Sequence, residues 1–132
     1  MKRLNKVQHG VREAALVFVG GAVGSLARYP VALALPGAWA TFAVNVLGSF
    51  LLGWLLGSAP SRSRRLLVGT GALGGFTTYS AFAVDVVALG AVGGPVLGLG
   101  FGLGQVAFGL VAALLGFAVA DAVRVHRAGG TT

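Results

Sequence analysis

The residues from Gly74 to Phe82 interrupt a long apolar stretch with two adjacent glycines, two threonines and a serine. Adjacent glycines weaken a helix, and threonine and serine hydroxyls compete for the hydrogen bonds of its backbone. A helix that breaks inside a membrane leaves carbonyl groups that can coordinate a cation and N–H groups that favour an anion. Such a break persists only where protein buries it or where it lines a cavity. The stretch therefore predicts a broken helix with an ion site.

Two aromatic residues lie just after the predicted break. Tyr79 and Phe82 are three positions apart and therefore share one face of a helix. The edge of an aromatic ring carries positive partial charge, so two ring edges could coordinate a small anion without offering a full charge. Ordinary packing of aromatic side chains explains the same spacing, and the spacing alone leaves both interpretations open.

Further polar residues stand inside or beside the apolar stretches. Asn45 could bond to a neighbouring helix or line a pore, and Gln105 raises the same question. A carboxylate at the depth of Asp85 must be paired, protonated or in contact with water, which makes it a functional candidate unless it reaches the membrane surface. Arg28 could anchor the chain at the interface or form a positive vestibule that concentrates anions.

The elements that position these residues follow from the composition. The chain is 56% hydrophobic and 10% charged, and its mean hydropathy is +0.88. Its apolar windows are long enough to cross a bilayer as helices, which takes about 20 residues each. All four prolines lie at or near the ends of these windows, where a missing N–H is tolerated. We predict a single all-α membrane domain over residues 1–132 with four transmembrane helices, at about 14–35, 38–57, 66–92 and 95–120, the third broken near its middle.

Basic residues set the orientation of these spans. They gather before the first span, between the second and third, and after the fourth: Lys2, Arg3, Lys6, Arg12, Arg62, Arg64, Arg65, Arg124 and Arg127. With four spans these segments share one side of the membrane, and because positive segments stay in the cytoplasm, both termini are predicted to be cytoplasmic. The net charge of +7 is then a topology signal, and no binding to nucleic acid is expected.

Small residues at four-residue spacing form faces along which membrane helices can approach closely. The sequence contains such faces at Gly20 with Gly24, at Ser49 with Gly53 and Gly57, and at Gly94 with Gly98 and Gly102. We predict helix contacts along them.

The sequence contains no convincing motif of a soluble enzyme. Residues 69–74 match the spacing G-x-G-x-x-G, but this dinucleotide fingerprint needs a strand–helix–strand context and an acidic residue about 20 positions later. His9 and His126 lie in the basic terminal segments, far from any carboxylate cluster. The chain is therefore predicted not to be an enzyme. Because it contains no cysteine, it has neither disulfides nor thiolate metal ligands.

Three stretches resemble the signature sequences of the CrcB/Fluc fluoride channel family. They are GAVGSLARY at residues 21–29, TFAVNVLGSFLLG at residues 41–53 and GALGGFTTYSAF at residues 71–82. They occur in the expected order and in the expected spans, whereas the fourth span adds little to the resemblance.

The resemblance implies a passive, fluoride-selective channel in the cytoplasmic membrane of a prokaryote, which lowers cytoplasmic fluoride. In this family two four-helix subunits pair antiparallel and form narrow pores. The site residues that the resemblance implies are Asn45, Tyr79, Ser80 and Phe82 for the fluoride path, Arg28 and Asp85 for an anion vestibule or polar track, and the backbone carbonyls of Gly74 and Thr77 for a structural sodium ion at the dimer centre.

The chain departs from the family pattern after the break and in the fourth span. Tyr79 stands where the family usually has phenylalanine, Ala81 replaces a threonine, and the fourth span offers Gln105 in place of hydroxyl residues. These departures point to a partly degraded ion path in this subunit.

The basic residues also bear on the partner. Antiparallel subunits that pair with themselves must insert in both orientations, which requires nearly balanced basic residues on the two sides. Because this chain is strongly biased, we expect a heterodimer with a homologous chain of opposite orientation, and a homodimer is the alternative.

Two other functions compete with that of a conducting subunit. The chain could be a structural partner that completes the pore of a homologous subunit without conducting. A small multidrug exporter also has four short spans in an antiparallel dimer, but it requires a glutamate embedded in the membrane. The sole glutamate of this chain, Glu13, stands beside Arg12 at the edge of the first span.

Overall fold

The computed structural model describes the backbone of residues 2–129 and the side chains of residues 7–129. Within that part of the chain every element is a helix, and four helical segments are long and apolar enough to cross a membrane. They are α1 (Lys2–Ala34), α2 (Ala38–Gly57), a third segment made of α3 (Arg62–Arg64), η1 (Arg65–Leu73), α4 (Gly74–Phe76) and α5 (Tyr79–Gly93), and finally α6 (Pro95–Gly129). The predicted all-α membrane fold with four transmembrane helices is confirmed.

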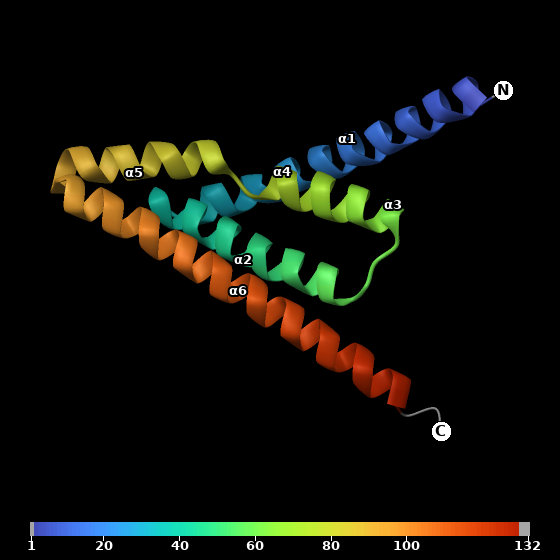
Figure 1. Ribbon diagram of the computed structural model, residues 1–132. Coiled ribbons are helices and arrows are strands. Elements are labelled where there is room, and N and C mark those ends of the chain that lie inside the picture. The colour runs from blue at the N-terminus through green and yellow to red at the C-terminus, as the bar shows by residue number, and fades with distance from the viewer. Residues whose placement is uncertain (1, 130–132) are drawn as a thin grey trace.

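The first and last helices are longer than the predicted spans. α1 begins at Lys2, well before residue 14, and α6 continues past Ala120 to Gly129. Both additions carry charged residues and lie at the same end of the molecule (Figure 1). Hydropathy marks only the part of a helix that fits the hydrocarbon core, whereas the backbone hydrogen bonding continues beyond it.

The third span is broken at Thr77 and Thr78, as predicted. Both residues are extended, with φ and ψ of −76° and 160° at Thr77 and of −144° and 118° at Thr78. The Thr77 hydroxyl donates to the Leu73 carbonyl at 2.9 Å, and the Thr78 hydroxyl accepts from the Ala81 N–H at 3.2 Å. The side chains that compete with the helix therefore also close its first half and cap its second.

The segment before the break is wound as a π-helix. At the end of η1 the N–H of Gly74 bonds to the carbonyl of Gly69, five residues earlier, instead of the four-residue step of an α-helix. π-helical turns are uncommon and occur frequently at functional sites. Only the three residues of α4 separate η1 from the break.

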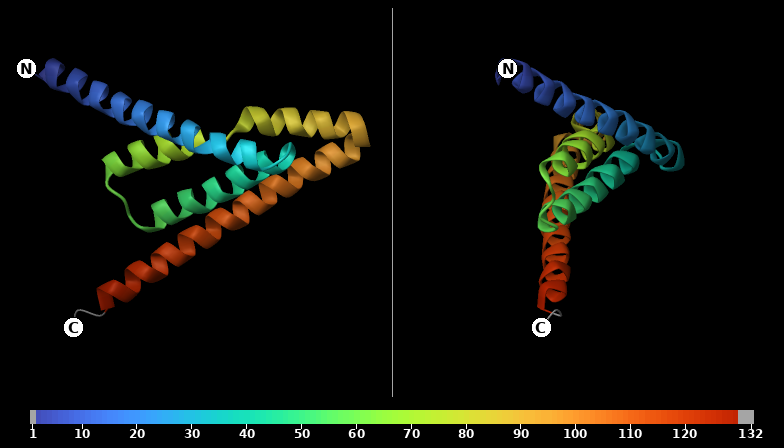
Figure 2. Two further views of the ribbon diagram at one scale, coloured as in Figure 1. Left: turned by 180° about the vertical axis from the view of Figure 1, so that it is seen from behind. Right: turned by 90° about the vertical axis from the view of Figure 1, so that its right-hand side faces the viewer.

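The helices form two groups, one on each side of the break. α1 packs against η1 and α4, whereas α6 lies along α2 and also packs against α5. Figure 1 shows α5 doubling back onto the start of α6, and Figure 2 shows α1 inclined away from α6. The start of α1, the short α3 and the end of α6 lie at one end of the molecule, opposite the turn between α5 and α6. The three basic segments of the sequence therefore lie at the same end.

Glycines bring the helices of the first group into backbone contact. A side chain at Gly20 would collide with the Leu67 carbonyl, and one at Gly24 with the Ala72 carbonyl, both in η1. The predicted contact face at these glycines is confirmed, because only hydrogen at the α-carbon lets the two backbones lie this close.

The second group uses the other predicted faces, with one exception. A side chain at Gly53 in α2 would collide with the Ala113 carbonyl of α6, and one at Gly98 in α6 with the Val86 carbonyl of α5. Gly94 was predicted to belong to such a face, and this is wrong. Its φ of +87° makes it the turn between α5 and α6, a conformation that glycine adopts without strain.

Candidate functional site

Asn45 of α2 holds the backbone of the break. Its Nδ2 donates to the Thr78 carbonyl at 3.1 Å, and its Oδ1 accepts from the Thr78 N–H at 2.8 Å. The Thr78 N–H has lost its helical acceptor at the break, and the bond to the Asn45 oxygen replaces it. Asn45 therefore forms an interhelical hydrogen bond, which was one of the two interpretations of this residue. It also borders a groove.

Arg28 of α1 reaches the neighbouring residue of the break. Its Nη1 donates to the Thr77 carbonyl at 3.2 Å, and the contact is partly buried. Ser25, about one turn earlier, donates to the Gly75 carbonyl at 3.4 Å. Two different helices thus hold the two extended residues, since α1 bonds to Thr77 and α2 bonds to Thr78.

The break also frees the carbonyl of Gly74. In a continuous helix this oxygen would accept from the N–H of Thr78, but that N–H bonds to Asn45 instead. The carbonyl of Thr77 is taken on one side by the Arg28 guanidinium. The two carbonyls predicted to hold a cation therefore differ. The Gly74 carbonyl has lost its helical donor, whereas the Thr77 carbonyl already accepts from the Arg28 guanidinium.

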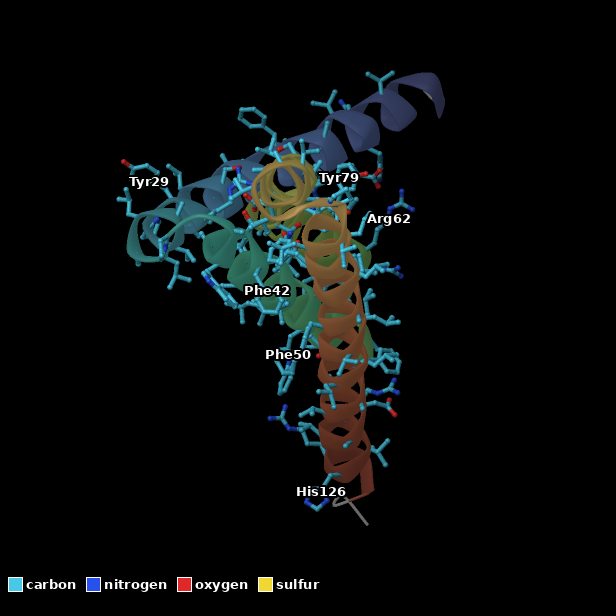
Figure 3. All side chains as sticks on the ribbon, turned by 90° about the vertical axis from the view of Figure 1, so that its left-hand side faces the viewer. Tyr29, Phe42, Phe50, Arg62, Tyr79 and His126 are labelled. Carbon is cyan, nitrogen blue, oxygen red and sulfur yellow. The ribbon has the colours of Figure 1, made fainter. Side chains whose placement is uncertain are left out.

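A groove of about 580 Å³ opens beside the break, bordered by parts of α2, η1, α5 and α6. The predicted site residues that border it are Asn45, Gly74, Thr77, Tyr79 and Phe82. The rings of Tyr79 and Phe82 lie 5.8 Å apart at an interplanar angle of 39°. Tyr79 is the first residue of α5 and is 81% exposed, and Figure 3 shows it beside that helix.

A second cavity, of about 300 Å³, lies between α1, α2 and the start of α5. Its polar lining consists of Arg28, Thr41, Thr78 and Ser80. The N-terminus of α5 adds partial positive charge to that of the arginine, so the cavity suits an anion. Tyr29, the next residue after Arg28, points away from the bundle instead (Figure 3).

Comparison with known proteins identifies the relatives of this chain. It matches the family described as "CrcB-like protein, Camphor Resistance (CrcB)" over residues 15–117. The chain belongs to this family. It is 44% identical over 134 residues to "Fluoride-specific ion channel FluC 2" of Leifsonia xyli subsp. xyli, with 90% of each chain covered. It is 40% identical over 124 residues to "Fluoride-specific ion channel FluC" of Gloeobacter violaceus, which covers 86% of this chain and 99% of the relative.

A third relative also matches over most of its length. "Fluoride-specific ion channel FluC 1" of Mycolicibacterium paratuberculosis is 41% identical over 130 residues, covering 91% of this chain and 98% of the relative. The family predicted from the three signature stretches is therefore confirmed, and the match to the CrcB family includes all three.

The predicted site residues of this CrcB-like protein do not all share one cavity. Tyr79 and Phe82 border the larger groove, whereas Ser80 borders the smaller cavity with Arg28. Thr78 borders both. Thr78 was not among the residues predicted for the site, although a threonine immediately before a helical stretch is a common N-cap.

Asp85 is placed apart from the residues that border the two cavities. Its Oδ2 is buried and finds no hydrogen-bond partner among residues 7–129. Asp85 as a whole is only half-buried, so both alternatives for it, a functional carboxylate and one that reaches the membrane surface, stay predictions.

Gln105 of α6 is the other polar residue left without partners. The residue is 4% exposed, and neither its Oε1 nor its Nε2 has a hydrogen-bond partner within the described part of the chain. It borders the larger groove together with Asn45 and Phe82.

Glu13 forms an ion pair with Arg62 at the end of the molecule that carries the basic segments, outside the helix bundle. Its two carboxylate oxygens accept from Nε and Nη2 of Arg62 at 2.7 and 3.1 Å. The Arg62 side chain is 80% exposed, so the pair is on the surface, where it links α1 to α3. A proton-coupling glutamate would have to lie inside the membrane bundle, and the structure does not place Glu13 there.

Proposed function

We propose that this chain is a subunit of a fluoride-selective channel that lowers cytoplasmic fluoride by passive export across the cytoplasmic membrane of a prokaryote. One observation carries the proposal, namely 44% identity over 90% of both chains to a relative named as a fluoride-specific ion channel. The prediction that the chain is not an enzyme is confirmed by its family. The broken third span, with a cavity and a groove beside it, brings polar side chains and unwound backbone into the bundle, and selective channels use such groups.

The proposed path passes the break from the smaller cavity to the larger groove. Arg28 and the N-terminus of α5 give the smaller cavity a positive potential, which draws in a small anion. Ser80 offers a hydroxyl donor at this cavity. In the groove the rings of Tyr79 and Phe82 offer ring edges, which favour an anion weakly enough to release it.

A sodium ion at the break is part of the proposal. The carbonyls of Gly74 and Thr77 belong to residues that border the groove, and unwound carbonyls coordinate sodium in other membrane proteins. The Gly74 carbonyl fits this role because it has lost its helical donor. The Thr77 carbonyl fits less well, because the Arg28 guanidinium takes one of its lone pairs and repels a cation. A bound sodium ion would supply a fixed positive charge at the dimer centre.

We further propose that a homologous four-span subunit pairs antiparallel with this chain. The larger groove holds extended backbone at membrane depth, which must be covered by protein or filled with water. The basic segments lie at one end of the molecule, which favours a single orientation with both termini in the cytoplasm (Figure 1). A chain that inserts one way needs a partner that inserts the other way, so a heterodimer is favoured over a homodimer.

Fluoride release from liposomes tests these proposals. The chain is reconstituted alone and together with a homologous chain of opposite charge bias, and chloride release is recorded in parallel. Fluoride-selective release only from the mixture supports the heterodimer, whereas release from this chain alone supports the channel and overturns the heterodimer. If neither preparation releases fluoride although the protein is folded, the proposal of a channel is overturned.

Substitution of Phe82 separates a conducting subunit from a structural one. Phe82→Ala removes a ring that borders the groove. A conducting subunit should lose fluoride release, whereas a subunit that only completes its partner's pore should tolerate the change.

A further inference from the structure

We propose that basic residues of α1 and of the start of the third span together bind the phosphate of an anionic phospholipid, such as phosphatidylglycerol. These residues are Arg12, Arg64 and Arg65, and we call them the arginine cluster. The inference depends on the membrane fold and not on ion conduction, so it can fail while the proposed channel stands.

An ion pair brings the two parts of the arginine cluster together. Both carboxylate oxygens of Glu13 in α1 accept from the Arg62 guanidinium of α3, although the two residues are 49 positions apart. Arg12 directly precedes Glu13, and Arg64 and Arg65 closely follow Arg62. Figure 3 shows Arg62 on the outside of the molecule. The pair therefore gathers guanidinium groups from two helices at one place on the surface.

The arginine cluster finds no carboxylate to pair with among residues 7–129. The whole sequence contains three acidic residues. Glu13 is occupied by Arg62, and Asp121 pairs with Arg124 near the end of α6. Asp85 belongs to α5, on the other side of the break from α3 (Figure 1). All three members of the cluster are exposed, so their charges are open to an anion from outside the chain.

The arginine cluster lies at the depth of the lipid headgroups. Apolar residues begin directly after it in both helices, at 14–19 in α1 and at 66–68 in the third span. Each helix therefore enters the hydrocarbon core just beyond its arginines, which places them level with the lipid phosphates. Val11 and Phe18 of α1 are 65% and 77% exposed, and acyl chains can lie against them.

The chemistry of guanidinium groups suits a lipid phosphate. Each group is planar and can donate two parallel hydrogen bonds to one phosphate. Basic pockets between transmembrane helices on the cytoplasmic side bind anionic headgroups in this way. Each arginine close to an anionic membrane surface strengthens binding about fivefold. A headgroup held from both sides would join α1 to the start of η1.

The test measures the melting temperature of the full-length protein in detergent micelles that contain increasing amounts of phosphatidylglycerol. Phosphatidylcholine, which has no net charge, is the comparison. We expect phosphatidylglycerol to raise the melting temperature and phosphatidylcholine to leave it unchanged. The double variant Arg12→Gln with Arg65→Gln should need at least tenfold more phosphatidylglycerol for half of this rise, because two contacts of about fivefold each are lost.

A second double variant, Arg124→Gln with Arg127→Gln, is the matched control. It removes the same charge from the end of α6, which Figures 1 and 2 show well apart from the start of α1. The control should respond to phosphatidylglycerol like the unmodified protein. If the cluster variant does not fold, the single variants Arg12→Gln and Arg127→Gln replace the pair, with a difference of about fivefold expected.

Three results would overturn the inference. The first is an equal effect of the two lipids on the unmodified protein. The second is an equal loss in both double variants, which would mean that the lipid responds to the overall positive charge of this end. The third is an equal rise with inorganic phosphate in micelles without phosphatidylglycerol, which would mean that the arginine cluster binds free phosphate and not a lipid.

Discussion

Gly48 of α2 lies directly against the γ-methyl of Thr77, so that a side chain at Gly48 would overlap it. Thr77 is one of the two extended residues of the break, and Asn45 holds the other from the same helix. The surface of α2 therefore shapes the break by close packing at one residue and by hydrogen bonds at the next.

Gly48→Ala should distort the break. The added methyl must displace Thr77, and overpacking of this kind costs about 1–3 kcal/mol. We expect a lower melting temperature in detergent and slower fluoride release from liposomes. Gly104→Ala is the matched control, because no described atom lies within 4 Å of the Cβ it would add. That control should be neutral or slightly stabilising, and equal behaviour of the two variants would contradict the packing role of Gly48.

Thr78→Val should weaken the start of α5. Valine matches threonine in shape but cannot accept the hydrogen bond from the Ala81 N–H that the Thr78 hydroxyl now accepts at 3.2 Å. Loss of an N-cap costs about 1 kcal/mol, which thermal unfolding can detect. Thr78→Ser keeps the hydroxyl and should behave like the unmodified protein. If both variants unfolded alike, the cap would not contribute.

Arg28→Gln should slow fluoride entry most strongly at low ionic strength. The arginine borders the smaller cavity, and its charge attracts anions over a distance that salt shortens to about 10 Å at 0.1 M. We expect the difference from the unmodified channel to shrink as an impermeant salt is added. A difference that does not depend on salt would mean that Arg28 acts mainly through its bond to the Thr77 carbonyl.

Glu13→Gln should leave fluoride release unchanged. Glu13 pairs with Arg62 on the surface, and exposed pairs of this kind contribute little to stability. A loss of transport in this variant, or coupling of transport to a proton gradient, would revive the exporter alternative.

The orientation can be mapped with single cysteines, because the sequence contains none. Ser63→Cys lies in α3, at the end that carries the basic segments, and Pro36→Cys lies in the connection between α1 and α2. In intact cells a membrane-impermeant thiol reagent should label Pro36→Cys and spare Ser63→Cys. Labelling of both positions to similar extents would show dual insertion and would contradict the heterodimer.

The break was predictable because its causes are local. Two glycines and two threonines lie within five consecutive residues, and the hydroxyls that end and begin the helices bond to residues within about one turn. The apolar windows were equally local signals, so the number and order of the spans could be read from the sequence.

The pairing of Asn45 with Thr78 was not predictable in the same way. The two residues are 33 positions apart, and their contact depends on how α2 crosses the third span. Nothing in either residue's neighbourhood indicates the partner of the other. By contrast, Ser80 could have been separated from Tyr79 and Phe82, because adjacent positions on a helix point in different directions.

The two-residue break divides the third span into two helical halves, one before Thr77 and one after Thr78. Its first half is packed mainly on α1 and its second half mainly on α6, so we expect each half to follow a different neighbour. A bilayer with longer or shorter acyl chains changes the tilt of the helices that cross it. In a continuous rod the resulting strain would be spread over many turns, but in this protein it falls on Thr77 and Thr78. We therefore expect membrane thickness to act on the residues that shape the proposed ion path.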